Sequence, residues 1–352
     1  MTRLTDYLER AVKDHASDLF IVAGGAVSAK IENRLVPISE DRVFPAETEE
    51  LVREVYTLAE RPIDRFLQQG DDDFSFSLAG LARFRVNVYR QRGSMAAVIR
   101  VVAFDIPDWK DLSIPEQVMD LAGVTHGMVL VTGTAGSGKS TTQACIIDRI
   151  NRTRECHIIT LEDPIEYLHR DRKSIVSQRE VAIDTQNYPS ALRACLRQAP
   201  DVILLGEMRD QETIHTAMTA AETGHLLIAT LHTKGAVNTI DRIVDTFPSG
   251  QQDQVRVQLS MVLHTVVSQQ LVPDANGGLV PAFEIMHVNN AIRSLIRDSK
   301  THQIDNAIAA GGAEGMMSMD QSLLGLYKSR QITAETALSY ADNPEQLKRR
   351  MM

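Results

Sequence analysis

The segment GMVLVTGTAGSGKSTT (127–142) decides the fold class of this 352-residue chain. Residues 127–132 are mostly apolar and lead into glycines, which predicts a short buried strand followed by a tight turn. Residues 133–140 match the pattern G-x-x-x-x-G-K-[ST], and the residues after them favour a helix. A loop in this setting points backbone amides at phosphate oxygens. The alternative is a glycine-rich turn that matches by accident, but the strand before it and the helix after it favour a phosphate loop.

Each part of this phosphate loop (133–140) has a chemical role. The glycines allow the tight turn, the lysine meets the β- and γ-phosphates, and the hydroxyl of Ser140 is a ligand for Mg²⁺. We therefore expect a nucleotide and Mg²⁺ as cofactors. The expected nucleotide-binding residues are Gly133, Gly136, Ser137, Gly138, Lys139, Ser140 and Thr141.

Three further apolar segments alternate with amphipathic stretches after the loop. They are HIITLED (157–163), DVILLGE (201–207) and HLLIATLH (225–232). Short apolar strands separated by helices predict a parallel sheet covered on both faces, and hence an α/β fold. From about residue 251 onward we expect helices. The helical segments are QVRVQLSMVLHTVVSQQL (254–271), AIRSLIRD (291–298) and MDQSLLGLYKSR (319–330).

The first 110 residues predict a separate, small α+β domain. Leu4, Leu8 and Val12 recur at helical spacing, and residues 47–60 form a second amphipathic pattern. The period then changes to two, which predicts strands. These strands are DFSFSL (73–78), ARFRVNVYR (82–90) and AAVIRVV (96–102). A proline-containing stretch at 104–116 is interpreted as a linker, so the expected domains are 1–110 and 111–352.

Composition narrows the class of protein. The formal net charge is -9, which argues against a general nucleic-acid binder. The three cysteines, Cys145, Cys156 and Cys195, form no CxxC pair, so a reducing compartment is the simplest interpretation. No apolar run approaches about 18 residues. We therefore expect a cytoplasmic protein that reaches a membrane only through a partner.

Polar side chains follow the predicted strands at the point where each strand ends. Glu162, Asp163 and Glu166 come after the second strand, Glu207 after the third, and His232 after the fourth. In a parallel α/β sheet these ends meet at one edge, where ligands bind. We therefore expect these groups to converge on the γ-phosphate and its metal.

Glu207 stands one residue beyond the usual position of a magnesium-binding aspartate, which is Gly206 here. We expect Glu207 to hold the metal through water and Glu166 to orient the attacking water. His232 is expected to donate a hydrogen bond to the γ-phosphate.

Each of these residues also has a structural interpretation. Glu162 and Asp163 would cap a helix that begins after Pro164. Glu207 would pair with Arg209 or Arg242. His232 would be a structural histidine.

Six segments together resemble the type IV pilus retraction ATPases, a PilT-like group within the secretion and pilus motor superfamily. They are TGTAGSGKSTT (132–142), TLEDPIEYLH (160–169), SQREVAIDT (177–185), ALRACLRQAPDVILLGEMRD (191–210), AAETGHLLIATLHT (220–233) and TIDRIVDTFP (239–248). AIRSLIRD (291–298) resembles the C-terminal signature of the retraction branch.

The resemblance implies a PAS-like N-terminal domain and a RecA-like ATPase domain that assemble as a homohexamer. It implies ATP as the nucleotide and an inner-membrane pilus platform protein as the partner. Residue by residue, the roles in the phosphate loop fall on Lys139 and Ser140. Glu166 takes the position of the catalytic carboxylate, Glu207 that of the second carboxylate, and His232 that of the histidine box.

The chain departs from the family pattern in the phosphate loop and in DLFIVAGGAVSAKIENRLVPI (18–38), where the expected His and Pro positions of the N-terminal signature are altered. The loop has Thr134 and Ala135 where the family has proline and threonine, and this leaves the backbone cradle intact. LRQAPDVI (196–203) resembles the accessory, PilU-like branch, so a retraction motor that depends on a second ATPase is an alternative. A nucleic-acid-translocating RecA-like ring and a low-turnover nucleotide-binding regulator are less favoured rivals.

Phosphoryl transfer gains about 10³ to 10⁵ in rate from an arginine that reaches the transition state. Arg83 and Arg85 lie on one face of a predicted strand, and Arg193 and Arg197 are spaced i, i+4 on a predicted helix. We expect Arg83 and Arg85 to supply this group, in the same subunit or a neighbouring one. The alternative is a solvated strand face.

Overall fold

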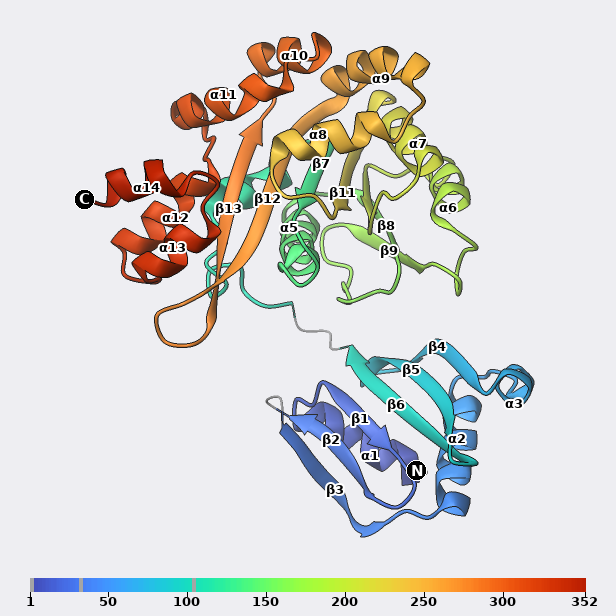
Figure 1. Ribbon diagram of the computed structural model, residues 1–352. Helices are drawn as coiled ribbons and strands as arrows, with labels where there is room; N and C mark the ends of the chain where they lie inside the picture. The colour runs from blue at the N-terminus through green and yellow to red at the C-terminus, as the bar shows by residue number, and fades with distance from the viewer. Residues whose placement is uncertain (1–2, 32–33, 103–105) are drawn as a thin grey trace. The chain divides into compact units, whose positions relative to one another are not determined.

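The computed structural model describes residues 3–31, 34–102 and 106–352 of the chain, which form two compact units (Figure 1). The first unit is Met1–Asp105 together with Glu166–Leu168, and the second is Ile106–Ile165 together with His169–Met352. The division therefore falls at residues 105/106 rather than at the expected 110. Residues 103–105, where the expected linker begins, lie outside the described residues.

The first unit is an antiparallel sheet packed with helices. Its strand order is β3-β2-β1-β6-β5-β4. The expected meander is present as β4 (Asp71–Leu78), β5 (Ala82–Gln91) and β6 (Ser94–Val102). The other elements are α1 (Arg3–Lys13), β1 (Asp18–Ile21), β2 (Ala26–Ile31), β3 (Arg34–Arg42), α2 (Pro45–Leu58) and α3 (Asp64–Gln69).

The second unit is built on a seven-stranded sheet with the order β13-β12-β7-β11-β10-β8-β9. All neighbouring strands pair in parallel except β12 and β13, which are antiparallel. The strands are β7 (Gly127–Thr132), β8 (His157–Glu162), β9 (Ile175–Glu180), β10 (Val202–Leu205), β11 (Leu226–Leu231), β12 (Leu263–Pro273) and β13 (Leu279–His287).

Helices cover both faces of this sheet. One face packs against α4 (Glu116–Met119) and α5 (Lys139–Thr153). The other face carries six helices: α6 (Tyr188–Cys195), α7 (Gln211–Glu222), α8 (Ala236–Asp245), α9 (Ser249–Val262), α10 (Asn290–Arg297) and α11 (Ile304–Ala310). Because β7, β10 and β11 lie between covered faces, every residue in them is buried.

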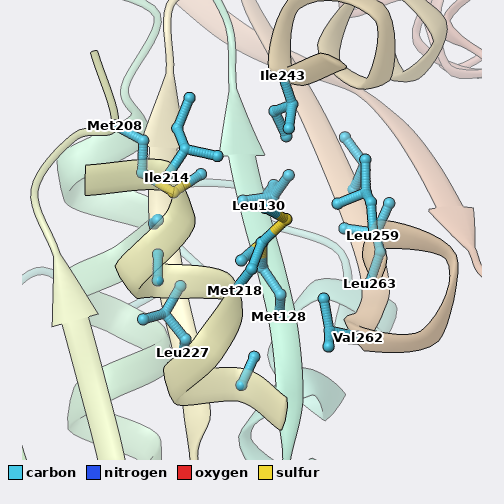
Figure 2. Packing of buried hydrophobic residues seen from close by; sticks show 14 of the residues in the cluster. Met128, Leu130, Met208, Ile214, Met218, Leu227, Ile243, Leu259, Val262 and Leu263 are labelled. Carbon is cyan, nitrogen blue, oxygen red and sulfur yellow. The ribbon is translucent and has the colours of Figure 1, made fainter. Parts of the chain in front are cut away.

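Figure 2 shows the larger of these cores, in which side chains from β7, α7, α8, α9 and the start of β12 meet. Its labelled members are Met128, Leu130, Met208, Ile214, Met218, Leu227, Ile243, Leu259, Val262 and Leu263. This packing fixes β7, whose end leads into the phosphate loop, against the helices of the second face.

Three C-terminal helices gather beside β13 (Figure 1). They are α12 (Met319–Lys328), α13 (Ala334–Tyr340) and α14 (Pro344–Met351), and they share a small core with β12 and β13. The outer edge of β13 is hydrogen-bonded to residues just before and within α12. Ile285 exchanges backbone bonds with Met317, and the Phe283 amide donates to Ser322 Oγ at 3.0 Å.

The predicted α/β class, with a mostly parallel sheet preceded by a smaller α+β unit, is confirmed. The prediction that residues 254–271 form one helix is wrong. The helix α9 ends at Val262, and β12 begins at Leu263. Val255, Leu259 and Val262 follow a helical period, but the β-branched Thr265, Val266 and Val267 that come next favour a strand. Periodicity alone does not separate the two states in a continuous apolar run.

Candidate nucleotide site

The phosphate loop turns sharply because three of its glycines adopt positive φ angles. These angles are 144° at Gly133, 76° at Gly136 and 87° at Gly138. Space as well as backbone geometry requires glycine at the first position. A Cβ atom built on Gly133 would lie 2.3 Å from the carbonyl oxygen of Gln269, far inside contact distance. The loop therefore lies directly against β12.

The ammonium group of Lys139 lies within this loop. The residue is only 7% exposed. Its Nζ donates to the carbonyl oxygens of Gly133 and Thr134, at 2.9 and 2.8 Å. An ammonium group held by carbonyl oxygens inside this loop is placed to bind an anion.

The start of α5 is open toward the same loop. The helix begins at Lys139, and the N-cap residue Gly138 offers no side-chain cap to the first amides. A 15-residue helix without a side-chain cap at its N-terminus carries positive partial charge there. Ser137 Oγ is buried here and has no hydrogen-bond partner among the described residues. These features fit a phosphate group, and the half-buried Ser140 and Thr141 follow at the mouth of the loop.

Glu207 follows β10 and is only 9% exposed. One carboxylate oxygen pairs with Arg209 Nε at 2.5 Å, and the other lies 3.2 Å from His232 Nε2. Because β10 and β11 are neighbouring parallel strands, their ends bring Glu207 and His232 together. We call these three residues the Glu207 cluster. The interpretation that Glu207 pairs with Arg209 is thus what the structure shows, whereas the metal contact stays a prediction.

The carboxylates after β8 have different surroundings. Glu162, the last residue of β8, accepts hydrogen bonds from Thr160 Oγ1 at 2.6 Å and from Gln178 Nε2 at 3.2 Å. Asp163 and Glu166 are exposed in the following loop. No helix begins after Pro164 in this described segment, so the interpretation of Glu162 and Asp163 as helix caps is wrong. Residues 163–170 are a loop that leads toward β9.

The two sets of arginines also differ. In the first unit, Arg85 is exposed and Arg83 half-buried on β5, opposite the buried Phe84 and Val86. In the second unit, Arg193 pairs with Glu212 of α7 at 2.5 Å. Helix α6 ends at Cys195, so Arg197 lies beyond it and does not extend one helical face.

Comparison with known proteins places this geometry in a family. The profile of the family described as type II/IV secretion system protein matches residues 1–345. The chain belongs to this family.

Its relatives include pilus motors. The type IV pilus retraction ATPase PilT of Pseudomonas aeruginosa is 42% identical over 97% of this chain and 99% of that protein. The type IV pilus ATPase PilU of the same species is 38% identical over 97% of this chain and 89% of that protein. A crystal structure of the pilus retraction motor PilT with bound ADP covers 99% of both chains at 44% identity, with a TM-score of 0.89. The predicted resemblance is confirmed.

Two findings on the described residues bear on the remaining predictions. Among the described residues, no helix is both long and apolar enough to cross a membrane. Across the same residues, no group of three or more His, Cys, Asp or Glu side chains could hold a metal ion.

Tyr188 is a residue of the site that the sequence analysis missed. It begins α6, and its hydroxyl lies 2.7 Å from the position that a Cβ atom on Gly206 would occupy. Burial raises the pKa of the Tyr188 phenol, and the neighbouring carboxylates, Glu207 first among them, raise it further. The ring therefore fills the space where the usual aspartate side chain would begin. The unusual Gly206 was the signal that could have revealed such a neighbour.

Proposed function

We propose that this chain is an ATP-hydrolysing motor that powers the retraction of type IV pili. The observation that carries the proposal is the full-length similarity to PilT, 42% identity over 97% of the chain, together with a complete phosphate loop around a buried Lys139. A family member that had lost nucleotide chemistry would have no reason to keep a buried ammonium in that loop.

Binding of ATP would use the phosphate loop as it stands. The amides at the start of α5 and the Lys139 ammonium would bind the β- and γ-phosphates. Ser140 is the residue that would hold Mg²⁺, with Glu207 beyond it through water. When bound, Mg²⁺ neutralises charge that develops on the phosphates.

Hydrolysis would then use the polar groups at the strand ends. Glu166 would accept a proton from the attacking water while the water oxygen bonds to the γ-phosphorus. The bond from that phosphorus to the bridging oxygen breaks, which yields ADP and phosphate. His232 would donate a hydrogen bond to the γ-phosphate, and Glu207, whose second oxygen lies 3.2 Å from His232 Nε2, would orient the imidazole.

The assembly follows from the same proposal. Motors of this kind would act as homohexamers on a pilus platform protein in the inner membrane, so the chain would be cytoplasmic and peripheral to that membrane. Arg83 and Arg85 would stabilise the transition state, in the same subunit or a neighbouring one. Rings that mix Arg85→Ala and Lys139→Ala subunits test supply from a neighbour. Recovery of ATPase activity in the mixture supports it, and no recovery at any ratio contradicts it.

Surface pilus number and retraction events, measured in cells that lack this chain, test the proposed function. Complementation with the Glu207→Gln form, compared with the unchanged chain, shows whether turnover is required. Excess pili that fail to retract would establish a principal retraction motor. Cells without pili would contradict the proposal, because an extension motor would then be missing.

The alternative is an accessory retraction motor that depends on a second pilus ATPase. The similarity to PilU, 38% identity over 97% of the chain, favours it as the second candidate. Normal pilus numbers with weakened retraction would support it.

Two other outcomes would favour the rival functions. Stimulation of the ATPase by DNA would favour a nucleic-acid translocase. Pilus retraction that is unchanged by Glu166→Gln and Glu207→Gln would favour a low-turnover regulator.

A further inference from the structure

Strand β12 carries two consecutive buried polar residues, Ser268 and Gln269, which are 1% and 3% exposed. Both lie on a strand otherwise suited to a hydrophobic core, where a polar side chain needs a partner. Their partners are two different loops of the candidate site. This pairing suggests a role beyond packing.

Gln269 forms the wall behind the phosphate loop. Its Oε1 accepts a hydrogen bond from Thr142 Oγ1, in the first turn of α5, at 2.7 Å. Its carbonyl oxygen abuts Gly133, and its Nε2 lies 2.8 Å from the position of a Cβ atom on Gly138. Gln269 therefore touches the loop at its first glycine, at its last glycine and in the helix that follows.

Ser268 holds the loop that carries His232. Its Oγ accepts a hydrogen bond from the backbone amide of Gly235 at 2.9 Å, just before α8 begins. Glu284, which is paired with Ser268 across the β12–β13 ladder, accepts from the next amide, that of Ala236, at 2.7 Å. The residues after His232 are thus fixed to the sheet at two successive amides.

The two side chains point to opposite faces of β12 because side chains alternate along a strand. Val267 belongs to the core formed with α5, and Val266 to the core formed with α8. Gln269 shares the face of Val267, and Ser268 that of Val266. A single peptide bond thus separates the support of the phosphate loop from the support of the His232 loop.

We propose that Gln269 and Ser268 are positioning residues of the nucleotide site. Gln269 holds the phosphate loop in the shape that binds nucleotide, and Ser268 holds the loop that presents His232 to Glu207. The role of Ser268 rests on the proposed ATP hydrolysis, whereas the role of Gln269 requires only nucleotide binding.

The two substitutions should affect different quantities: the affinity for ADP in the case of Gln269, and kcat in the case of Ser268. Gln269→Met keeps the volume but leaves Thr142 Oγ1 without its acceptor, and it should weaken ADP binding about tenfold. Ser268→Ala should leave ADP affinity within about twofold and lower kcat about tenfold, because it loosens only the His232 loop. Binding of a fluorescent ADP analogue and steady-state ATPase rates of the full chain measure both.

Thr265→Val is the matched control. Thr265 lies on the same strand, is fully buried, and hydrogen-bonds with His287 Nδ1 at 3.0 Å, toward the other end of β12. The proposal is overturned for Gln269 if Gln269→Met binds ADP with the same affinity as Thr265→Val. It is overturned for Ser268 if kcat falls no further than in that control.

Thr142→Val tests the Gln269 contact from the other side and serves if Gln269→Met fails to fold. In the double variant, both partners are gone, so the loss of ADP affinity should be clearly smaller than the product of the two single losses. Independent effects would contradict the contact. A wild-type chain that binds ADP but does not hydrolyse ATP would overturn the proposed function and the role of Ser268, and the ADP measurements would still decide the role of Gln269.

Discussion

The phosphate loop and the Glu207 cluster lie at the ends of neighbouring strands but are held in different ways. Contacts with main-chain groups hold most of the loop: Lys139 binds two carbonyl oxygens, and Gly133 lies against the backbone of β12. The side chain of Gln269 adds the hydrogen bond from Thr142.

Side chains hold Glu207, and the side chains of its partners Arg209 and His232 are 73% and 51% exposed. Backbone supports are fixed by the fold, whereas exposed ion pairs exchange partners at little cost. We therefore expect the loop to be preformed for nucleotide binding and the exposed partners of Glu207 to rearrange when nucleotide binds.

Replacement of Lys139 by alanine should have the largest effect of any change in the site. It would remove the charge-assisted hydrogen bonds that we expect this ammonium to form with phosphate, each worth about 1.5–3 kcal/mol. We expect ADP affinity to fall about a hundredfold or more, and ATP turnover to become undetectable. Calorimetric ADP titration and a phosphate-release assay check this. Lys328→Ala, on the exposed end of α12, is the control, and equal losses in both variants would contradict a specific role.

Glu207→Gln should reduce turnover about 10- to 100-fold and leave ADP binding nearly intact, because groups that orient the direct contacts of a site contribute about that much to activity. This outcome would sharpen the contrast between a loop that binds and a cluster that acts. Glu212→Gln is the matched control, since Glu212 forms an exposed ion pair with Arg193. If Glu207→Gln instead weakens ADP binding as strongly as Lys139→Ala, the two regions do not differ as described.

Gly206→Ala tests whether packing also fixes the end of β10. The new methyl group would lie 2.7 Å from the Tyr188 hydroxyl, so the ring must move. We expect a loss of about 1–3 kcal/mol in the free energy of unfolding, measured by urea denaturation. Tyr188→Phe removes that hydroxyl and should restore part of the loss in the double variant. No restoration would mean that the backbone contacts of Gly206 dominate.

The smallest effect is expected for Glu284. This carboxylate is buried, and among the described residues it forms no ion pair of the kind that Glu207 forms. Burial raises its pKa to about 7. The folded state therefore binds a proton that the unfolded state has released between about pH 5 and 7, and stability falls as the pH rises through that window. Glu284→Gln should remove this fall, which is on the order of 1 kcal/mol between pH 6 and 8.

Urea denaturation at pH 6, 7 and 8 measures this difference. Glu335→Gln, at an exposed position in the first turn of α13, should leave the pH dependence of the wild type unchanged. Parallel pH profiles for the wild type and Glu284→Gln would contradict the assignment.

The sequence predicted the parts of the fold that simple patterns determine. Strands β7, β8, β10 and β11 are short and apolar on both faces, and the phosphate loop follows a strict spacing of glycine and lysine. Strand β9 was missed because IVSQRE (175–180) is largely polar, and β12 because it continues directly from the apolar face of α9.

The candidate site divides along the same line. Lys139 and its loop were predictable because the spacing of glycine and lysine is local in sequence, as are the contacts of the Lys139 ammonium with Gly133 and Thr134. Tyr188, Ser268 and Gln269 were not, because each reaches the site from an element far along the chain. Gln269 lies 127 residues from its partner Thr142. Such contacts depend on the packing of the whole sheet, which a local pattern does not report.

The outer edge of β13 has a consequence for how the chain behaves among copies of itself. Exposed strand edges carry unpaired amides that invite a strand from another molecule. Here Ile285 exchanges both of its backbone bonds with Met317, and the amide of Phe283 is taken by Ser322. The chain thus blocks one route to sheet-to-sheet aggregation with its own C-terminal residues.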